Sequence, residues 1–210
     1  MPKVIAIDGP ASSGKSTLAK LISKKYKYPI LSSGRIYRAI ALEALNNNIR
    51  LHEHNKIIRC VSKINYEFIN SKNLYSSEID MMAANIATLE QLRKRLIKFQ
   101  RGFPKIFANK HKYVVVEGRD IGTVVFPEAK IKLFMWASPE VRAKRRYKQI
   151  QKSGGKPVYK RVYSEIIQRD KKDFNRKVAP LKPAANSVLL DTSYLDIEQV
   201  FNTIVSLIKK

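Results

Sequence analysis

Cysteine is nearly absent from this chain of 210 residues, which contains only Cys60. A single thiol excludes an intrachain disulfide framework and a metal cluster built from several cysteines. Long apolar runs are absent as well, because no uninterrupted apolar segment could span a bilayer, and the first residues show no leader-type cleavage pattern. We therefore expect a cytoplasmic protein without a membrane segment, and its 44% of hydrophobic residues suffice for a packed core.

Acidic residues are also scarce: 17 Asp and Glu face 41 Lys and Arg, for a net charge of +24. Such an excess fits a nucleic-acid binder or an enzyme that handles several phosphates at once. The lysines are scattered, without an RNA-binding signature or regularly interleaved aromatic residues. A solvated surface rich in lysine explains the charge equally well, because mutational drift in the coding DNA can produce such a composition. No specific nucleic-acid partner is predicted from it.

Glycines are few as well, eight in all, and two of them frame a phosphate-binding motif. An apolar run at residues 4–7 and Asp8 lead into a match to G-x-x-x-x-G-K-[ST]. In this motif backbone N–H groups turn inward around phosphate oxygens, Lys15 reaches the outer phosphates and the Ser16 hydroxyl can hold Mg²⁺. The residues predicted to bind a nucleoside triphosphate are Gly9, Pro10, Ala11, Ser12, Ser13, Gly14, Lys15, Ser16 and Thr17.

Strands and helices alternate along the chain. Apolar runs predict strands at residues 4–7, 29–31, 113–116, 131–137 and 187–190, and helical spacing predicts helices at about 16–25, 33–45, 79–109, 139–152, 159–174 and 197–208. Gly102 and Pro104 mark an interruption of the third helix, and residues 64–77 read as a small β-hairpin. This order predicts an α/β doubly wound parallel sheet, with ligands beyond the carboxyl ends of its strands.

Charged residues directly follow the buried strand at 113–116. Arg119 can hold a phosphate through two parallel hydrogen bonds, while Asp120 accepts from an amino or hydroxyl group. The alternative is an ion pair in a solvated loop. Ser33, after the preceding strand, is either the N-cap of its helix or a ligand contact, and Arg38 follows one turn later, where it can point at an anion.

Two arginine rows on predicted helices leave their role open. Arg169, Asp173 and Arg176 are spaced i, i+4 and i+7, so on one helix they share a face and form a cation–anion–cation row. Such a row could contact phosphate and sugar, or be an ordinary surface salt-bridge ladder. Arg142, Arg145 and Arg146 present the same choice, and spacing settles neither row.

Taken together, these motifs resemble the bacterial cytidylate kinases, which belong to the nucleoside-monophosphate kinases. The resemblance covers nearly the full length and rests on residues 7–17, 33–38, 93, 100–101, 117–127, 169–176 and 179–181. The Gly-Arg-Asp-x-Gly-Thr segment combined with the downstream Arg-Asp-x-x-Asp-x-x-Arg is specific to that family. It favours the functional interpretation of the row from Arg169 to Arg176.

The resemblance implies transfer of the terminal phosphoryl group of ATP to CMP or dCMP, with Mg²⁺ held by Ser16. It implies catalytic roles for Lys15, Arg119, Arg169 and Arg176, and acceptor binding by Ser33, Arg38, Arg93, Arg119, Asp120, Arg169, Asp173 and Arg176. Arg93 and Asp120 would read cytosine. The fold implied is of the P-loop NTPase type, with a small acceptor-binding insert and a helical lid.

In this division the core spans about 1–63, 94–138 and 177–210, the insert about 64–93 and the lid about 139–176, in a chain expected to be monomeric. Three residues depart from the family pattern: Ser32 replaces an aspartate, Ala84 a serine that helps read cytosine, and Asp80 an arginine. The segment 78–93 is also shorter. Alternatives are a kinase for another nucleoside monophosphate or small hydroxy acid, and a P-loop nucleic-acid-binding protein.

Overall fold

A five-stranded parallel sheet forms the centre of the molecule. The computed structural model describes residues 1–71, 74 and 76–209. The strands are β1 (Lys3–Asp8), β2 (Ile30–Ser32), β3 (Tyr113–Gly118), β4 (Ile131–Trp136) and β5 (Val188–Asp191), in the order β2-β3-β1-β4-β5. All the paired strands run parallel, which confirms the predicted doubly wound sheet.

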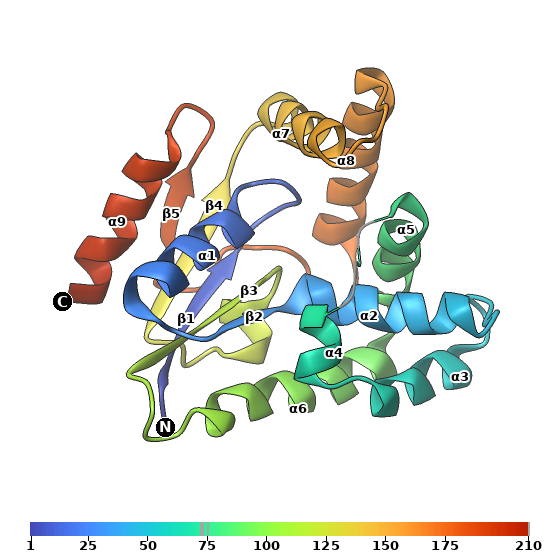
Figure 1. The fold of residues 1–210 in the computed structure, drawn as a ribbon, viewed down its shortest axis with the longest axis horizontal. Coiled ribbons are helices and arrows are strands. Elements are labelled where there is room, and N and C mark those ends of the chain that lie inside the picture. Colours follow the sequence, from blue (N-terminus) through green and yellow to red (C-terminus); the bar gives the residue numbers. More distant parts are fainter. Residues whose placement is uncertain (72–73, 75, 210) are drawn as a thin grey trace.

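Helices cover both faces of this sheet (Figure 1). One face packs against α1 (Lys15–Tyr26) and α9 (Ile197–Lys209). The other packs against α2 (Ser33–Asn46), α3 (His54–Arg59), α4 (Tyr66–Ser71), α5 (Ser77–Ile86) and α6 (Glu90–Ile106), with a short 3-10 helix, η1 (Cys60–Lys63), between α3 and α4. Within the described residues, no helix combines the length and the apolar character needed to cross a membrane.

The central strand β1 shows why two cores form. Val4 and Ala6 point into the core on the side of α2 and α6, whereas Ile5 and Ile7 point into the core on the side of α1 and α9. Successive side chains of a strand face opposite sides of the sheet, so a strand covered on both faces is apolar throughout. This explains the uninterrupted apolar run that predicted the strand.

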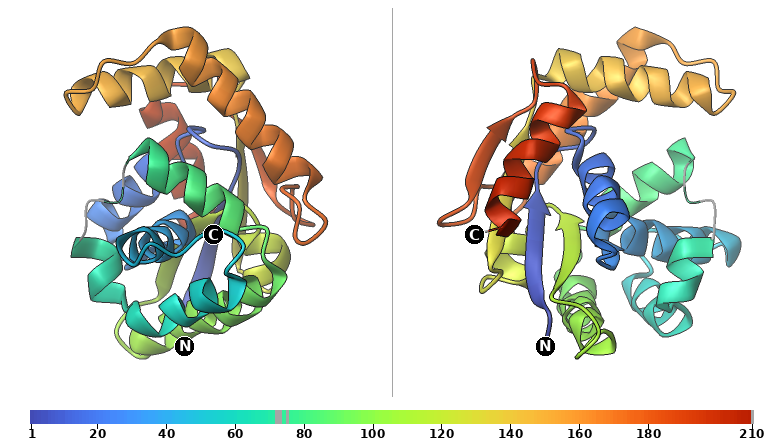
Figure 2. Two further views of the ribbon diagram at one scale, coloured as in Figure 1. Left: turned by 90° about the vertical axis from the view of Figure 1, so that its right-hand side faces the viewer. Right: turned by 60° about the vertical axis from the view of Figure 1, so that its left-hand side comes forward.

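Two further helices extend beyond the carboxyl ends of the strands. These are α7 (Pro139–Lys152) and α8 (Tyr159–Asn175), and in Figures 1 and 2 they form an arm at the opposite end of the molecule from the N-terminus. Ser138 caps α7 by accepting from the Val141 N–H. The pair lies at the edge of the sheet where the predicted ligand-binding residues gather.

The predicted β-hairpin is wrong where the structure describes it. Residues 66–71 form helix α4, while residues 72, 73 and 75 lie outside the described residues. The Tyr66 ring stacks on Phe99 of α6 at 4.6 Å between centroids, and its hydroxyl donates to the Phe99 carbonyl at 2.7 Å. A partial alternation of apolar residues fits either a strand or a helix, and packing against α6 favours the helix here.

The interruption expected at Gly102 and Pro104 is also wrong. Helix α6 runs through both residues and ends at Ile106, and the break lies earlier, at residues 87–89 between α5 and α6. Pro104 is buried in the last turn of α6, where only one backbone hydrogen bond is lost before the helix ends.

Gly9 is required by close packing between the phosphate-binding loop and β4. A Cβ atom at Gly9 would lie 2.0 Å from the Met135 carbonyl oxygen, and the residue has a φ of +147°. Gly154, after α7, also has a positive φ, of +82°, but a Cβ atom there would meet nothing within 4 Å. Comparing substitutions at the two glycines therefore separates the effect of a positive φ from the effect of a steric collision.

We predict that Gly9→Ala lowers the free energy of unfolding by about 2–4 kcal/mol, because strain and collision act together. Gly154→Ala, the matched control, should cost only about 1 kcal/mol from its left-handed backbone. Urea unfolding followed by circular dichroism measures both. Equal losses in the two variants would contradict a collision at Gly9.

Candidate active site

The phosphate-binding loop joins β1 to α1 in a conformation that glycine permits. Gly14 is the N-cap of α1 with a φ of 97°, and it precedes Lys15 directly. The Lys15 side chain is buried, and its ammonium donates to the Pro10 carbonyl at 2.6 Å and to Ser13 Oγ at 3.3 Å. Burial, together with the nearby Arg119 guanidinium, lowers the pKa of Lys15 well below its ordinary value.

A carboxylate from β3 faces the last part of this loop. Glu117 Oε1 accepts from Ser16 Oγ at 3.0 Å and also from the Ser32 hydroxyl. Ser32 and Glu117 are register partners on β2 and β3, which brings them side by side. The two hydroxyls and the carboxylate are hard oxygen ligands of the kind that Mg²⁺ prefers, so their chemistry fits that ion.

Glu117 was not among the predicted site residues. The available signal was its place at the carboxyl end of a buried strand next to the phosphate-binding loop. Its partner Ser32 is neutral and donates to Glu117, so this contact adds no second negative charge.

Asp8, at the end of β1, holds the segment that follows β3. Its two carboxylate oxygens accept from the backbone N–H groups of Ile121 and Gly122 at 2.8 and 2.7 Å. Both residues belong to η2 (Ile121–Val125), a single π-helical turn. Burial raises the pKa of Asp8 to about 6, although the two hydrogen bonds act in the opposite direction.

Asp173 joins two of the predicted arginines. It accepts from Arg119 Nε at 2.8 Å, and Arg169 Nε lies 3.6 Å from the same oxygen. Burial alone would raise the pKa of Asp173, but the two guanidinium groups hold it below its ordinary value. Arg119 and Asp173 are therefore a partly buried ion pair at the sheet edge, and not a solvated loop pair.

Asp120 joins two more arginines. It accepts from Arg93, and Arg176 lies 3.6 Å from its other oxygen. Arg93 also donates to the Tyr37 hydroxyl at 3.2 Å, and burial raises the pKa of Tyr37 to about 12. Arg93 Nε and one terminal nitrogen of Arg176 are buried without a hydrogen-bond partner, so this group has donor capacity left over.

Two details of these residues differ from the helical interpretations that the sequence left open. Arg176 does not continue the helical row of Arg169 and Asp173, because α8 ends at Asn175 and Arg176 has an extended backbone with φ −65° and ψ 138°. Ser33 is not the N-cap of α2; Ser32 is, and no side chain caps that helix. Ser33 is nevertheless buried at the first position of α2, next to Gly118.

Arg142, Arg145 and Arg146 of α7 have three separate sets of partners. Arg142 is fully buried and donates to both oxygens of Asp170 at 2.9 and 2.5 Å and to the carbonyls of Ala137 and Ala11. Arg145 donates to Thr192, and Arg146 reaches Asp80 of α5 at 2.7 Å. Spacing could not reveal this, since the Arg142 and Asp170 partners are 28 residues apart.

A family model described as cytidylate kinase matches residues 5–210 of this chain. The chain belongs to the cytidylate kinase family. It is 42% identical over 200 residues to the cytidylate kinase of Bartonella tribocorum, which covers 95% of this chain and 91% of that protein. With the cytidylate kinase of Thermotoga maritima it shares 40% identity over 218 aligned positions, covering 98% and 96% of the two chains.

Among solved structures, an uncharacterized protein from Eubacterium ventriosum has a TM-score of 0.57, with 14% identity and 99% of both chains covered. At that identity the likeness concerns the fold alone.

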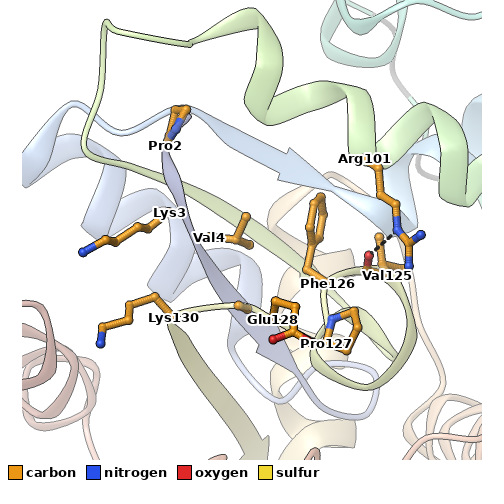
Figure 3. Close-up of a pocket in the computed structure, with 10 residues that line it drawn as sticks. Pro2, Lys3, Val4, Arg101, Val125, Phe126, Pro127, Glu128 and Lys130 are labelled. Carbon is orange, nitrogen blue, oxygen red and sulfur yellow. Dashed lines mark hydrogen bonds between the residues drawn. The ribbon is translucent and has the colours of Figure 1, made fainter.

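In this cytidylate kinase family member, a surface cavity of about 400 Å³ lies away from these residues. It is lined by Pro2, Lys3 and Val4 at the amino end of β1 and by the segment around Pro127, as Figure 3 shows. Its one guanidinium, from Arg101, already donates to the Val124 and Val125 carbonyls. Parallel sheets bind their ligands at the other end of the strands, so the cavity is not the candidate active site.

We predict that ionisation of the Asp8 carboxylate lowers the free energy of unfolding. The folded protein holds the proton more tightly than the unfolded chain does, since the pKa rises from 3.8 to about 6 on folding. Wild-type stability relative to Asp8→Asn should therefore fall as the pH rises from about 4 to about 7, by about 3 kcal/mol in total. Urea unfolding across this range measures the difference.

The Asn side chain does not titrate, so the slope of the difference with pH reports proton binding by Asp8. Glu165→Gln, in an exposed pair with Arg161, is a suitable control. A difference between wild type and Asp8→Asn that does not vary with pH would contradict the prediction.

We also predict that Arg142→Met destabilises the protein by about 3–5 kcal/mol, because it leaves Asp170 buried without its partner. The double variant Arg142→Met/Asp170→Leu should recover part of the loss, since no unpaired charge remains. Urea unfolding of both variants tests this. A double variant less stable than Arg142→Met would argue against an unpaired carboxylate as the cause.

Proposed function

We propose that this chain transfers the terminal phosphoryl group of ATP to CMP or dCMP, giving ADP and CDP or dCDP. Family membership supports the reaction. The observation that carries the assignment of the site is the convergence of a phosphate-binding loop with buried arginines at one sheet edge, where Asp120 and Asp173 are each shared by two arginines. That excess of positive charge suits the phosphates of two nucleotides.

On the donor side, residues 9–17 would bind the ATP phosphates through backbone N–H groups and through Lys15. Mg²⁺ would be held near Ser16 and Glu117, where it would neutralise charge on the phosphate oxygens. For this, the Lys15 ammonium would exchange its contact with the Pro10 carbonyl for a phosphate oxygen. Its buried environment strengthens that interaction, because little water competes.

On the acceptor side, Ser33, Arg38 and Arg119 would contact the phosphate of CMP, and Arg169 and Asp173 its phosphate and sugar. Arg93 and Asp120 would read cytosine. A carboxylate accepts from the exocyclic amino group of cytosine, and a guanidinium donates to its ring acceptors. The nitrogens of Arg93 and Arg176 that lack a hydrogen-bond partner would supply the donors that such contacts require.

The chemistry proposed is positional. Phosphoryl transfer needs aligned reactants and cations around the moving group more than it needs a general base. Lys15, Arg119, Arg169 and Arg176 would surround that group. We further propose that α7 and α8, within residues 139–176, close as a lid over ATP and exclude water, and that residues 64–93 form the acceptor-side insert.

Base selectivity is expected to be softened and not lost. Ala84, half-buried on α5, replaces a serine that helps read cytosine in the resembled family. One missing hydroxyl contact should weaken discrimination by about 0.5–1.5 kcal/mol.

The test is ADP release from ATP and Mg²⁺ with CMP, dCMP, UMP, AMP, dTMP or no acceptor. We predict fast turnover with CMP and dCMP, weak turnover with UMP and none with the others. Lys15→Met should lower kcat at least about a hundredfold, because it removes a preorganised cation. Lys20→Met, which changes an exposed lysine of the same helix, is the matched control.

Turnover with another acceptor, but not with CMP, would make the chain a kinase for that compound. Tight, salt-sensitive binding of polynucleotide without any turnover would instead support a nucleic-acid-binding protein. Normal activity of Lys15→Met would overturn the proposed role of the loop.

A further inference from the structure

Asp80 lies at a junction between the two sides of the candidate active site. It is half-buried in the first turns of α5. One carboxylate oxygen lies 2.5 Å from Arg38 Nε on α2, and the other accepts from Arg146 of α7 at 2.7 Å. Arg169 of α8 donates to the Asp80 backbone carbonyl at 3.3 Å.

The arginines around Asp80 thus come from the proposed acceptor side and from the proposed lid. A further polar contact joins the same helices, since Lys172 of α8 donates to Asn85 of α5 at 3.0 Å. Among the described residues, the side-chain hydrogen bonds and ion pairs between α5 and the pair α7 and α8 all involve Asp80 or Asn85. Asp80 supplies the only negative charge among them.

The chemistry of this arrangement is that of an anion site. Several arginines converging from different elements on one carboxylate would bind a phosphate group in the same way, with more negative charge to attract them. Arg38 is also one of the residues proposed to contact the acceptor phosphate. Asp80 therefore forms an ion pair with the guanidinium that the acceptor phosphate would contact.

We propose that Asp80 is an internal substitute for the acceptor phosphate. In the enzyme without nucleotide it holds Arg38 and ties the lid helix α7 to α5. The phosphate of the acceptor then exchanges with the Asp80 carboxylate on Arg38, so part of its binding energy is spent on breaking this contact. The contact of Asp80 with Arg146 of α7 does not depend on the proposed function. The effect of Asp80 on acceptor binding rests on the proposed function.

Two variants test the contact. Asp80→Asn removes the charge, and Arg146→Gln removes its partner on α7. We expect Asp80→Asn to lower the KM for CMP by about three- to fivefold, the scale of a partly exposed ion pair, with kcat changed less than about twofold. Arg146→Gln should not lower the KM, because it breaks only the contact with α7 and leaves Asp80 on Arg38. The double variant should have the KM of Asp80→Asn, because without the carboxylate Arg146 has no ion pair left to lose.

Hydrogen exchange of the protein without nucleotide tests the lid contact separately. Amides of α5 and α7 should exchange faster in Asp80→Asn than in wild type, with exchange in β1 and β3 unchanged. Glu165→Gln is the matched control, because it removes one negative charge from an exposed pair within α8. It should alter neither the KM nor the exchange of α5.

A higher KM for CMP in Asp80→Asn would overturn the proposal, because it would show that Asp80 orients Arg38 for the acceptor. Unchanged exchange in α5 and α7 would overturn it too, whatever the activity. Faster exchange in a protein that turns over no acceptor would leave the lid contact supported and locate the failure in the proposed function.

Discussion

Compensation of buried arginine charge is the constraint on which the site depends. A guanidinium removed from water costs several kcal/mol unless an anion and further acceptors face it. Arg142 meets this requirement with Asp170 and two carbonyls, and is completely enclosed. Compensation is less complete for the four arginines that share Asp120 and Asp173 in pairs. The folded protein therefore has an excess of positive charge at the site where the phosphates of the nucleotides are proposed to bind.

The parallel sheet positions two carboxylates at this site, at the carboxyl ends of its strands. Asp8 and Ser32 end β1 and β2, and Glu117 is the second-last residue of β3, which lies between those two strands. The register pairs Asp8 with Gly118 and Ser32 with Glu117. Backbone hydrogen bonding in the sheet thus places Glu117 beside Ser32 and Asp8 beside the end of β3. The helices that carry Arg38, Arg169 and Arg142 then approach the same edge from three directions (Figures 1 and 2).

The same electrostatic contacts connect the site to the helices proposed to move. Arg142 ties the base of α7 to the Ala11 carbonyl of the phosphate-binding loop and to α8, while Arg146 ties its middle to Asp80. The first contact is buried and bidentate, and the second is half-exposed and single. The proposed movement of α7 would therefore break the contact at Asp80 more easily than the one at Asp170, since solvent competes only at Asp80.

The phosphate-binding loop, the parallel strands and the outer helices could be predicted from the sequence, because each depends on a local pattern of glycines or apolar residues. Helix α4 could not, since residues 66–71 have no decisive period and Tyr66 is held by Phe99 of α6. Nor could the ion pairs of Arg93 with Asp120 and Arg119 with Asp173, whose partners lie 27 and 54 residues apart. The sequence determined which charged residues this protein has and where along the chain they follow strands or lie on helices. Only tertiary packing decided which of them are buried and which compensate one another, because partners so distant meet only after the sheet has formed.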